Sequence, residues 1–399
     1  MHDMQFALMI LAWLMAIPLS IILIYLTAEI ASGLTRSGKD AAPVMSGNWS
    51  GVILVPAHNE ASGIAATVEA LQFSAPDCRI LVVADNCTDE TASLARTAGA
   101  ETISRSDPDH RGKGFALAYG RDFLAKAPPD AVVVIDADCR LSEGSVARLV
   151  EKAVTSGEPV QSVNLLERTV TTSPLVDISN FAMLVKNLVR ARGLARMGGG
   201  VLLFGTGMAF PWKLFARLDL ATSNAVEDIE LGLALARRGV KVSFEDGALV
   251  TSPAASIADS KGQRSRWEHG FLQAAAHNGL PLLFSGLRQR SRHLVAIGAH
   301  MLVPPLAILM LLSIFMLLGV SIIAFWSGYY APLLVLLVSF FGAVTLLLVA
   351  WWKEGRDVIT YKSLMRFPFY IMWKIPIYLG FFTSRQTGWN RTRRDGEKP

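Results

Sequence analysis

Residues 132–138 read VVVIDAD, a β-branched run followed by two acids. A short β-branched run of this kind is typical of a buried strand in a parallel sheet. Two similar runs precede it, at residues 51–55 and 80–84. Stretches with helical patterns separate the three runs. This alternation predicts an α/β fold with a mostly parallel sheet flanked by helices.

Each of the three predicted strands ends in residues suited to a binding site. Pro56 follows the first strand, Asp85 follows the second, and Asp136 and Asp138 follow the third. In open α/β sheets, ligands bind outside the carboxyl ends of the strands. We therefore expect these positions to face one crevice.

The composition indicates a membrane protein, because 52% of the 399 residues are hydrophobic and the mean hydropathy is positive. Residues 6–28, 294–325 and 331–352 are almost uncharged, and each reaches the roughly 20 residues that a spanning helix needs. The first is too long for a cleaved signal peptide and is expected to be a retained signal anchor. A fourth run, 367–382, is short and contains Lys374 and two prolines, so we expect it to be interfacial or re-entrant.

Lys and Arg are concentrated after the first span, before the second and after the third, while the turn at 327–330 carries no charge. Because basic loops stay in the cytoplasm, the N-terminus is expected outside an inner or plasma membrane and the middle region in the cytoplasm. The net charge of +5 suits anionic lipid as well as nucleic acid, and we expect no nucleic-acid partner.

The predicted organisation has three parts. Residues 1–45 form the anchor and a linker, and residues 46–280 form the α/β domain. Residues 281–399 form a C-terminal membrane region with two spanning helices, an interfacial helix and a basic tail. The sequence does not indicate an oligomeric state.

Two acidic pairs are candidates for chemistry. Asp136 and Asp138 lie on the same side of an extended strand end, where Mg²⁺ or Mn²⁺ is bound by one or two carboxylates plus phosphate oxygens. The alternative is ordinary helix-entry chemistry. In Glu227-Asp228, Asp228 suits a general base that deprotonates an acceptor hydroxyl, with Glu227 supporting it. The alternative there is a favourable interaction of acids with a helix dipole.

A third candidate is the set Gln263, Arg266 and Trp267 on a predicted amphipathic helix at 261–278. Arg266 offers a planar, charged fork for pyrophosphate, and Gln263 lies on the same helical face. Trp267 provides a flat surface on which a sugar ring can stack. The alternative is an interfacial Trp whose neighbouring Arg reaches toward lipid headgroups.

Two glycine-containing turns are weaker candidates. Lys113 lies in the turn at 110–114 before a helix, where backbone amides and basic side chains can meet phosphate. A solvated basic loop is the alternative. Gly205-Thr206-Gly207 permits close backbone approach of a ligand, although a plain turn explains it equally well.

In combination, these motifs resemble the family 2 glycosyltransferases. More narrowly, they are similar to the membrane-embedded branch that includes cellulose, hyaluronan and poly-N-acetylglucosamine synthases and ceramide glucosyltransferase. The resemblance covers residues 51–278 and is carried by these residues in order: Val55-Pro56-Ala57-His58-Asn59-Glu60, Asp85-Asn86, Asp136-Ala137-Asp138, Glu227-Asp228 and Gln263-x-x-Arg266-Trp267.

The resemblance implies a GT-A fold, a nucleotide-diphosphate sugar donor and inverting transfer that depends on Mg²⁺ or Mn²⁺. It implies donor binding by Pro56, Ala57, Asn59, Glu60, Asp85, Asp136, Gln263 and Arg266, and the turn at 110–114 adds Lys113 as a further candidate for the donor phosphates. It places the metal at Asp136 and Asp138, the base at Asp228 with Glu227 beside it, and the acceptor at Trp267 and the turn Gly205, Thr206 and Gly207.

The resulting hypothesis is transfer of a hexosyl or N-acetylhexosaminyl group from a UDP-sugar to a lipid or polysaccharide acceptor at the cytoplasmic face of the bilayer. One alternative is a polyprenyl-phosphate sugar transferase, which shares the GT-A fold. Another is a non-catalytic membrane scaffold subunit of a polysaccharide synthase. The sugar, the acceptor and the number of sugars added per encounter stay open.

Overall fold

The computed structural model describes residues 2–35, 48–167, 173–224, 226–253 and 257–383. Within these ranges, the side chains of residues 2, 257–264, 266 and 381–383 are outside the described part. The chain divides into two compact units. Unit 1 contains residues 1–36, 172–199 and 272–385, and unit 2 contains residues 37–171, 200–271 and 386–399.

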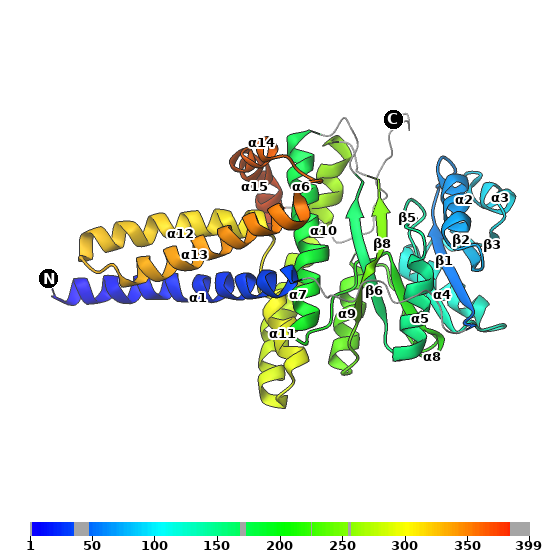
Figure 1. Cartoon of the computed structure of the whole chain (residues 1–399), viewed down its shortest axis with the longest axis horizontal. Coiled ribbons are helices and arrows are strands. Elements are labelled where there is room, and N and C mark those ends of the chain that lie inside the picture. Colours follow the sequence, from blue (N-terminus) through cyan, green and yellow to red (C-terminus); the bar gives the residue numbers. More distant parts are fainter. Residues whose placement is uncertain (1, 36–47, 168–172, 225, 254–256, 384–399) are drawn as a thin grey trace. The chain divides into compact units, whose positions relative to one another are not determined.

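Unit 2 is built on a mixed sheet of eight strands in the described part of the chain, in the order β3-β2-β1-β4-β7-β6-β8-β5 (Figure 1). The pairs β3–β2, β2–β1, β1–β4 and β6–β8 are parallel, and the pairs β4–β7, β7–β6 and β8–β5 are antiparallel. The strands are β1 Gly51–Ala57, β2 Arg79–Asp85, β3 Glu101–Arg105, β4 Ala131–Val134, β5 Arg140–Leu141, β6 Val160–Leu166, β7 Met208–Pro211 and β8 Ser243–Ser252.

The three strands expected from the sequence are β1, β2 and β4, and they are direct neighbours in the parallel part of the sheet. The mostly parallel α/β fold is therefore confirmed. The helices of this unit in the described residues are α2 Ile64–Ser74, α3 Thr91–Thr97, α4 Lys113–Leu124, α5 Ser145–Ser156, α8 Trp212–Phe215, α9 Glu227–Arg237 and the N-terminal part of α10 Ile257–Gln289.

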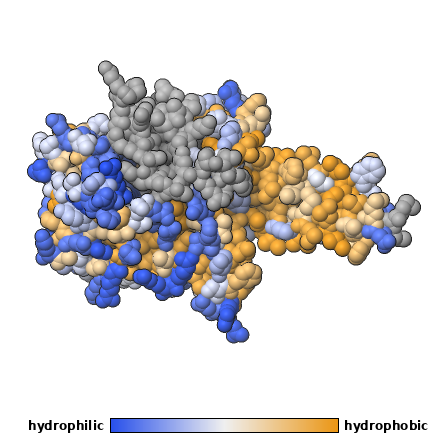
Figure 2. Space-filling view, turned by 180° about the vertical axis from the view of Figure 1, so that it is seen from behind, coloured by the Kyte–Doolittle hydropathy of each residue, from blue (hydrophilic) through white to orange (hydrophobic). Residues whose placement is uncertain are grey.

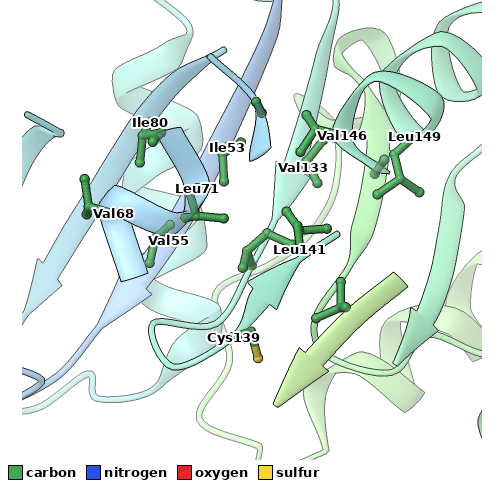
Figure 3. Close-up of a cluster of buried hydrophobic side chains, with 14 of the residues drawn as sticks. Ile53, Val55, Val68, Leu71, Ile80, Val133, Cys139, Leu141, Val146 and Leu149 are labelled. Carbon is green, nitrogen blue, oxygen red and sulfur yellow. The ribbon is translucent and has the colours of Figure 1, made fainter. Parts of the chain in front are cut away.

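Alternate residues of β1 face opposite helical layers. Ile53 and Val55 belong to a buried cluster that also contains Leu71 of α2 and Leu149 of α5 (Figure 3). The burial of each such side chain contributes roughly 1.5–3 kcal/mol to folding. On the other face, α4 approaches β1 so closely that a Cβ at Gly120 would lie 2.6 Å from Leu54 Cδ1. This approach fixes the start of α4 over the carboxyl ends of the strands.

Unit 1 is helical. Its elements are α1 His2–Leu34, α6 Pro174–Leu184, the π-helix η1 Val185–Arg190, α7 Ala191–Arg196, the C-terminal part of α10 Ile257–Gln289, α11 Arg292–Met301, α12 Leu306–Ser327, α13 Ala331–Ala350, the π-helix η2 Trp351–Gly355, α14 Tyr361–Leu364 and α15 Phe367–Thr383. Figure 2 shows the apolar surface over the packed helices α1, α12 and α13.

Three helical stretches in the described residues are long and apolar enough to cross a membrane: Asp3–Leu34, Leu306–Ser327 and Ala331–Gly355. The expected number of spans is confirmed. The predicted start of the second span at Leu294 is wrong, because Pro304 and Pro305 interrupt the helix. The residues before them form the separate helix α11. The run at 367–382 forms α15, which is not among the three stretches.

A buried polar cluster ties three elements of unit 1 together. Glu29 of α1 is fully buried, and its carboxylate accepts a hydrogen bond of 2.5 Å from Arg190 Nε of η1. The other oxygen of this carboxylate lies 2.5 Å from His300 Nδ1 of α11. Removal of one partner from a buried ion pair costs about 3–5 kcal/mol, because the remaining charge stays buried. The cluster therefore holds α11 against the end of α1.

Candidate active site

The carboxyl ends of β2, β1 and β4 bring the predicted strand-end residues to one edge of the sheet. Ala57 pairs with Ala84, so the end of β1 is level with Asp85, the last residue of β2. Leu54 pairs with Val134, and Asp136 follows two residues later. Polar groups from distant parts of the sequence thus gather at one edge.

Lys113, the first residue of α4, lies at the centre of this group of polar residues. Its ammonium group donates hydrogen bonds to Asp136 Oδ1 and, at 2.6 Å, to the carbonyl oxygen of Gly205. Burial would lower the pKa of Lys113, but the charges of Asp136, Glu227 and Asp228 outweigh this effect and raise it. Lys113 therefore stays charged and neutralises part of an acidic cluster.

The turn at 205–207 is held in place from both ends. The Thr206 hydroxyl accepts a hydrogen bond of 3.1 Å from the backbone N–H of Asp136. Gly205 and Gly207 have φ angles of 83° and 68°, which favour glycine. A Cβ at Gly205 would lie 3.3 Å from Asp228 Oδ2, and a Cβ at Gly207 would lie 1.9 Å from Ser162 Oγ. Both positions therefore favour glycine, because the φ angle is positive and because a Cβ atom would crowd a neighbouring side chain.

Glu227 and Asp228 are the first two residues of α9. Asp228 Oδ1 accepts a hydrogen bond of 2.9 Å from the backbone N–H of Ile229, while its Oδ2 faces the backbone of Gly205. Burial, followed by the negative charge of Asp228, raises the pKa of Glu227 to about 7. A carboxyl group with such a pKa exchanges protons readily near neutral pH.

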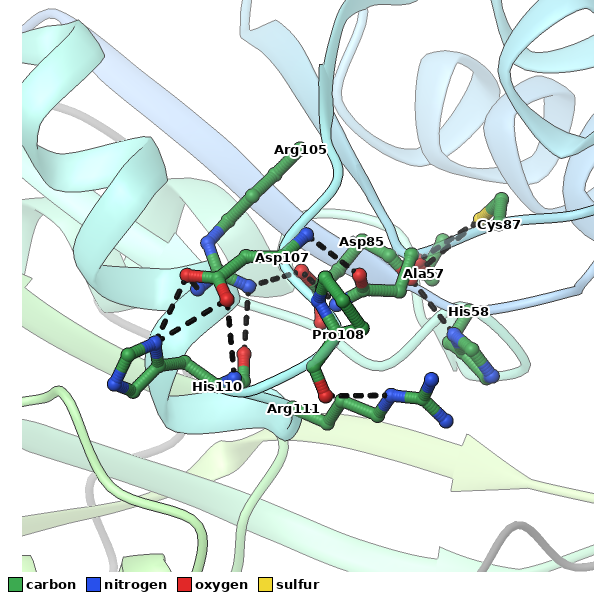
Figure 4. A network of polar contacts seen from close by, with 10 residues as sticks. Ala57, His58, Asp85, Cys87, Arg105, Asp107, Pro108, His110 and Arg111 are labelled. Atoms are coloured by element: carbon green, nitrogen blue, oxygen red, sulfur yellow. Dashed lines mark hydrogen bonds and ion pairs between the residues drawn. The ribbon is translucent and has the colours of Figure 1, made fainter.

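The ends of β1 and β2 form a separate polar network (Figure 4). Asp85 is buried, and its carboxylate accepts a hydrogen bond of 2.7 Å from Arg105 Nη1. The same guanidinium group also donates a hydrogen bond of 2.9 Å to the Asp107 carboxylate and one of 2.7 Å to the carbonyl oxygen of His110. Sequence reasoning did not identify Arg105 or Asp107. Arg105 could have been found in the same way as Asp85, because it is the last residue of the next strand, β3.

The remaining predicted donor residues follow β1. Pro56 and Ala57 are the last two residues of the strand. Asn59 has a φ angle of 54°, and its side-chain oxygen accepts a hydrogen bond of 2.7 Å from Thr88 N–H. The backbone N–H of Glu60 donates a hydrogen bond of 2.7 Å to the Thr91 hydroxyl. These bonds connect the loop after β1 to the loop after β2.

Asp136 and Asp138 are half-buried, and Cys139 Sγ lies 3.5 Å from Asp138 Oδ1. In the described part of the chain, no three His, Cys, Asp or Glu side chains are grouped as metal ligands. Two carboxylates are nevertheless sufficient protein ligands for Mg²⁺ or Mn²⁺ when phosphate oxygens supply others. The residues present thus suit a cation that arrives with a diphosphate.

Trp267 lies on α10 and is exposed. One turn further along this helix, a Cβ at Gly270 would lie 2.2 Å from Val226 Cγ1. Val226 immediately precedes Glu227, so α10 packs against the start of α9 near the acidic pair. The side chains of Gln263 and Arg266 lie outside the described residues.

The chain is similar to known proteins in sequence and in fold. Residues 51–270 match the family model described as glycosyltransferase like family 2. A mannosyltransferase from Pyrobaculum calidifontis, solved in complex with GDP-Man and Mn²⁺, is 17% identical, with a TM-score of 0.50. The alignment covers 89% of this chain and 98% of that one. This likeness confirms the GT-A type of fold.

Glucosyl-3-phosphoglycerate synthase from Mycobacterium tuberculosis, solved with Mn²⁺, UDP-glucose and phosphoglyceric acid, is 20% identical, with a TM-score of 0.38. That alignment covers 57% of this chain and 79% of the other. No curated protein sequence matches the chain significantly. The family match extends over more than half of the 399 residues and includes every strand of the sheet. The chain belongs to glycosyltransferase family 2.

Proposed function

We propose that the protein transfers a sugar, with inversion, from a UDP-sugar to a membrane-associated glycolipid or polysaccharide acceptor in a metal-dependent reaction. The observation that carries the proposal is the cluster around Lys113. This cluster joins Asp136 at a strand end, the glycine turn at 205 and the acidic start of α9. The three helices that can cross a membrane support an acceptor in or at the bilayer.

Asp228 is assigned as the general base. Its carboxylate takes the proton of the acceptor hydroxyl while that oxygen bonds to the anomeric carbon of the donor. The bond between the anomeric carbon and the diphosphate oxygen breaks at the same time, and the diphosphate leaves with the electron pair. Asp228 Oδ2 faces the backbone of Gly205, and the acceptor hydroxyl would approach the base beside this turn. Attack from the side opposite the leaving group inverts the anomeric carbon.

Glu227 supports the base electrostatically. Burial, followed by the negative charge of Asp228, raises the pKa of Glu227 to about 7. A general base such as Asp228 serves a hydroxyl acceptor, which must lose its proton. A polyprenyl-phosphate acceptor is already ionised at neutral pH and has no such need, which favours the first function over this alternative.

The donor end is assigned to Asp136, Asp138, Lys113, Asp85 and the loop after β1. A divalent cation on Asp136 and Asp138 would neutralise charge on the leaving diphosphate. Lys113 adds a permanent positive charge at the same place. Arg266 and Gln263 would bind the pyrophosphate from α10, and Trp267 would stack on the acceptor sugar. Pro56, Ala57, Asn59 and Glu60 would line the nucleotide pocket.

The test is a donor panel with the full-length protein in detergent, lipid extract and Mn²⁺. UDP-glucose, UDP-N-acetylglucosamine, UDP-galactose and GDP-mannose are offered, and released diphosphate and product mass are measured. One UDP-sugar should be consumed, with a product that carries the sugar on a hydroxyl group. Asp228→Asn should lower turnover by ~10²–10⁴-fold, the usual contribution of a general base.

A product with the sugar on a phosphate would instead establish the polyprenyl-phosphate activity. Full turnover by Asp228→Asn would overturn the base assignment. No turnover with any donor, together with no donor binding, would favour a non-catalytic scaffold subunit.

A further inference from the structure

We propose that the α10–α11 hairpin binds an anionic phospholipid at the membrane interface. The hairpin is defined as residues 272–301, which contain the C-terminal part of α10 and all of α11. It belongs to unit 1, together with α1 and the other two candidate spans. The proposal concerns a lipid that stays bound as part of the protein's surroundings and is independent of the sugar transfer.

The two arms of the hairpin are packed closely through glycines. A Cβ at Gly298 of α11 would lie 2.4 Å from the backbone nitrogen of Leu283, and one at Gly286 of α10 would lie 2.5 Å from that of Val295. At the tip, the backbone N–H of Ser291 donates a hydrogen bond of 2.9 Å to the carbonyl oxygen of Gly286. The hairpin is therefore a defined element and can present side chains in fixed positions.

The direction of the hairpin fits an interfacial position. Figure 1 shows that α10 and α11 run across the direction of α1 within this unit. The Tyr25 hydroxyl donates a hydrogen bond of 2.8 Å to the Ala296 carbonyl, which joins α11 to α1. Tyr25 lies in the last third of the first candidate span, where aromatic residues typically mark the boundary between hydrocarbon and headgroups. If α1 crosses the bilayer, the hairpin lies along its surface.

One face of the α10 arm is apolar and exposed. Leu280, Phe284 and Leu287 are 51%, 64% and 59% exposed, and their spacing places them on one side of the helix. Large apolar side chains in such a row are suited to insertion between lipid chains. In water they would favour aggregation, so a bilayer is the occupant that their chemistry selects.

The tip of the hairpin is strongly basic. Arg288, Arg290 and Arg292 are all exposed, and none of them forms an ion pair with another described residue. In Figure 2 the projecting end is hydrophilic, next to apolar surface. Basic residues beside apolar ones at a membrane surface are typical of sites for anionic headgroups.

A groove connects the basic tip with the apolar region. It has a volume of about 340 Å³, and its lining includes Tyr25, Met197, Leu287, Arg290, Arg292 and Val295. Its size is in the range of small-molecule sites. Arg290 and Arg292 can hold a phosphodiester, while the apolar lining can hold the start of an acyl chain. Arg288 lies on the same tip but does not line the groove, which makes it a matched control.

The test is native mass spectrometry of the full-length protein in detergent with added phosphatidylglycerol, phosphatidylcholine or inorganic phosphate. Phosphatidylglycerol should give the tightest adducts. In the double variant Arg290→Gln/Arg292→Gln, its Kd should rise roughly 30-fold, the effect of two charges near an anionic headgroup. Arg288→Gln should change it less than about threefold. Leu287→Gln should weaken phosphatidylglycerol binding without affecting any binding of inorganic phosphate.

Thermal unfolding of each variant in detergent provides the check on folding, because all four positions are exposed. The proposal is overturned if phosphatidylcholine binds as tightly as phosphatidylglycerol, or if the double variant and Arg288→Gln lose lipid equally. It is also overturned if inorganic phosphate competes fully with the lipid, since the site would then recognise the phosphate alone.

Discussion

Lys113 Nζ lies 2.6 Å from the carbonyl oxygen of Gly205, so a side chain at the start of α4 holds the turn that faces Asp228. The two residues are 92 positions apart in the sequence. Because the same ammonium group also binds Asp136, one cation connects the proposed donor end of the site to the proposed acceptor end.

Lys113→Met should lower transfer by ~10²–10³-fold, because loss of one preorganised electrostatic group has effects of this size. Without the ammonium charge, the carboxylates of Asp136, Glu227 and Asp228 repel one another more strongly, and the pKa of Glu227 should rise further. Steady-state kinetics at several pH values measure both effects. The control Lys126→Met changes an exposed lysine beyond the other end of α4 and should leave the rate of transfer unchanged. Equal activity of the two variants would refute the role of Lys113.

Gly205→Ala should abolish most transfer, because its Cβ would lie 3.3 Å from the Asp228 carboxylate at a φ angle of 83°. Gly157→Ala is the matched control. It has a φ angle of 68°, but its Cβ would meet nothing within 4 Å. Both substitutions should lower the unfolding free energy by about 1 kcal/mol through backbone strain. Kinetics and thermal unfolding, measured together, should show that only Gly205→Ala impairs transfer.

The pH dependence of transfer should reflect the acidic pair. Burial and the charge of Asp228 raise the pKa of Glu227 to about 7, so its protonation below neutral pH removes a negative charge beside the proposed base. The kcat/KM should therefore fall as the pH decreases through about 7. Glu227→Gln should be slower and should lose the acid limb near pH 7, because the carboxyl group that titrates there is absent. If Glu227→Gln is inactive at every pH and Asp228→Asn is active, the two roles are reversed.

Removal of divalent cations with a chelator should stop transfer, and Mn²⁺ or Mg²⁺ should restore it. Asp138→Asn should raise the cation concentration required for half-maximal activity, because one ligand loses its charge. Asp122→Asn, at an exposed position on α4, should leave this concentration unchanged. Undiminished turnover in excess chelator would contradict the proposed metal site.

Arg105→Met should destabilise the protein by about 3 kcal/mol, because it leaves the buried carboxylate of Asp85 without its cation. The control Arg79→Met breaks the exposed pair with Glu101 and should cost less than about 1 kcal/mol. Thermal unfolding of the full chain in detergent compares the two variants. A similar shift of the unfolding temperature in both variants would show that burial does not increase the contribution of the Asp85–Arg105 ion pair to stability.

Local patterns account for the parts of the structure that the sequence predicted. The β-branched runs identified β1, β2 and β4, and apolar length identified three spans, because both signals lie within one segment. Pro304 and Pro305 also signal the break before α12, but they lie within one continuous apolar run. Adjacent prolines are the stronger constraint, because both lack the N–H that a helix needs.

Long-range pairings could not be predicted in this way. The ion pair of Asp85 with Arg105 and the hydrogen bond of Lys113 to Gly205 depend on which strands are neighbours. The antiparallel position of β7 between β4 and β6 is likewise a property of the whole sheet. The predicted roles of the site residues, including Gln263 and Arg266, stay predictions.

The helical run of α6, η1 and α7 lies in the chain between β6 and β7, yet it belongs to unit 1. The sheet is therefore encoded on both sides of a segment that packs with α1 and with helices made later. No continuous fragment contains the whole sheet without this segment. During synthesis, β6 leaves the ribosome before the run and β7 after it, so the sheet can be completed only after this segment of unit 1 has been made. Expression of unit 2 without unit 1 would require residues 172–199 to be replaced by a polar linker.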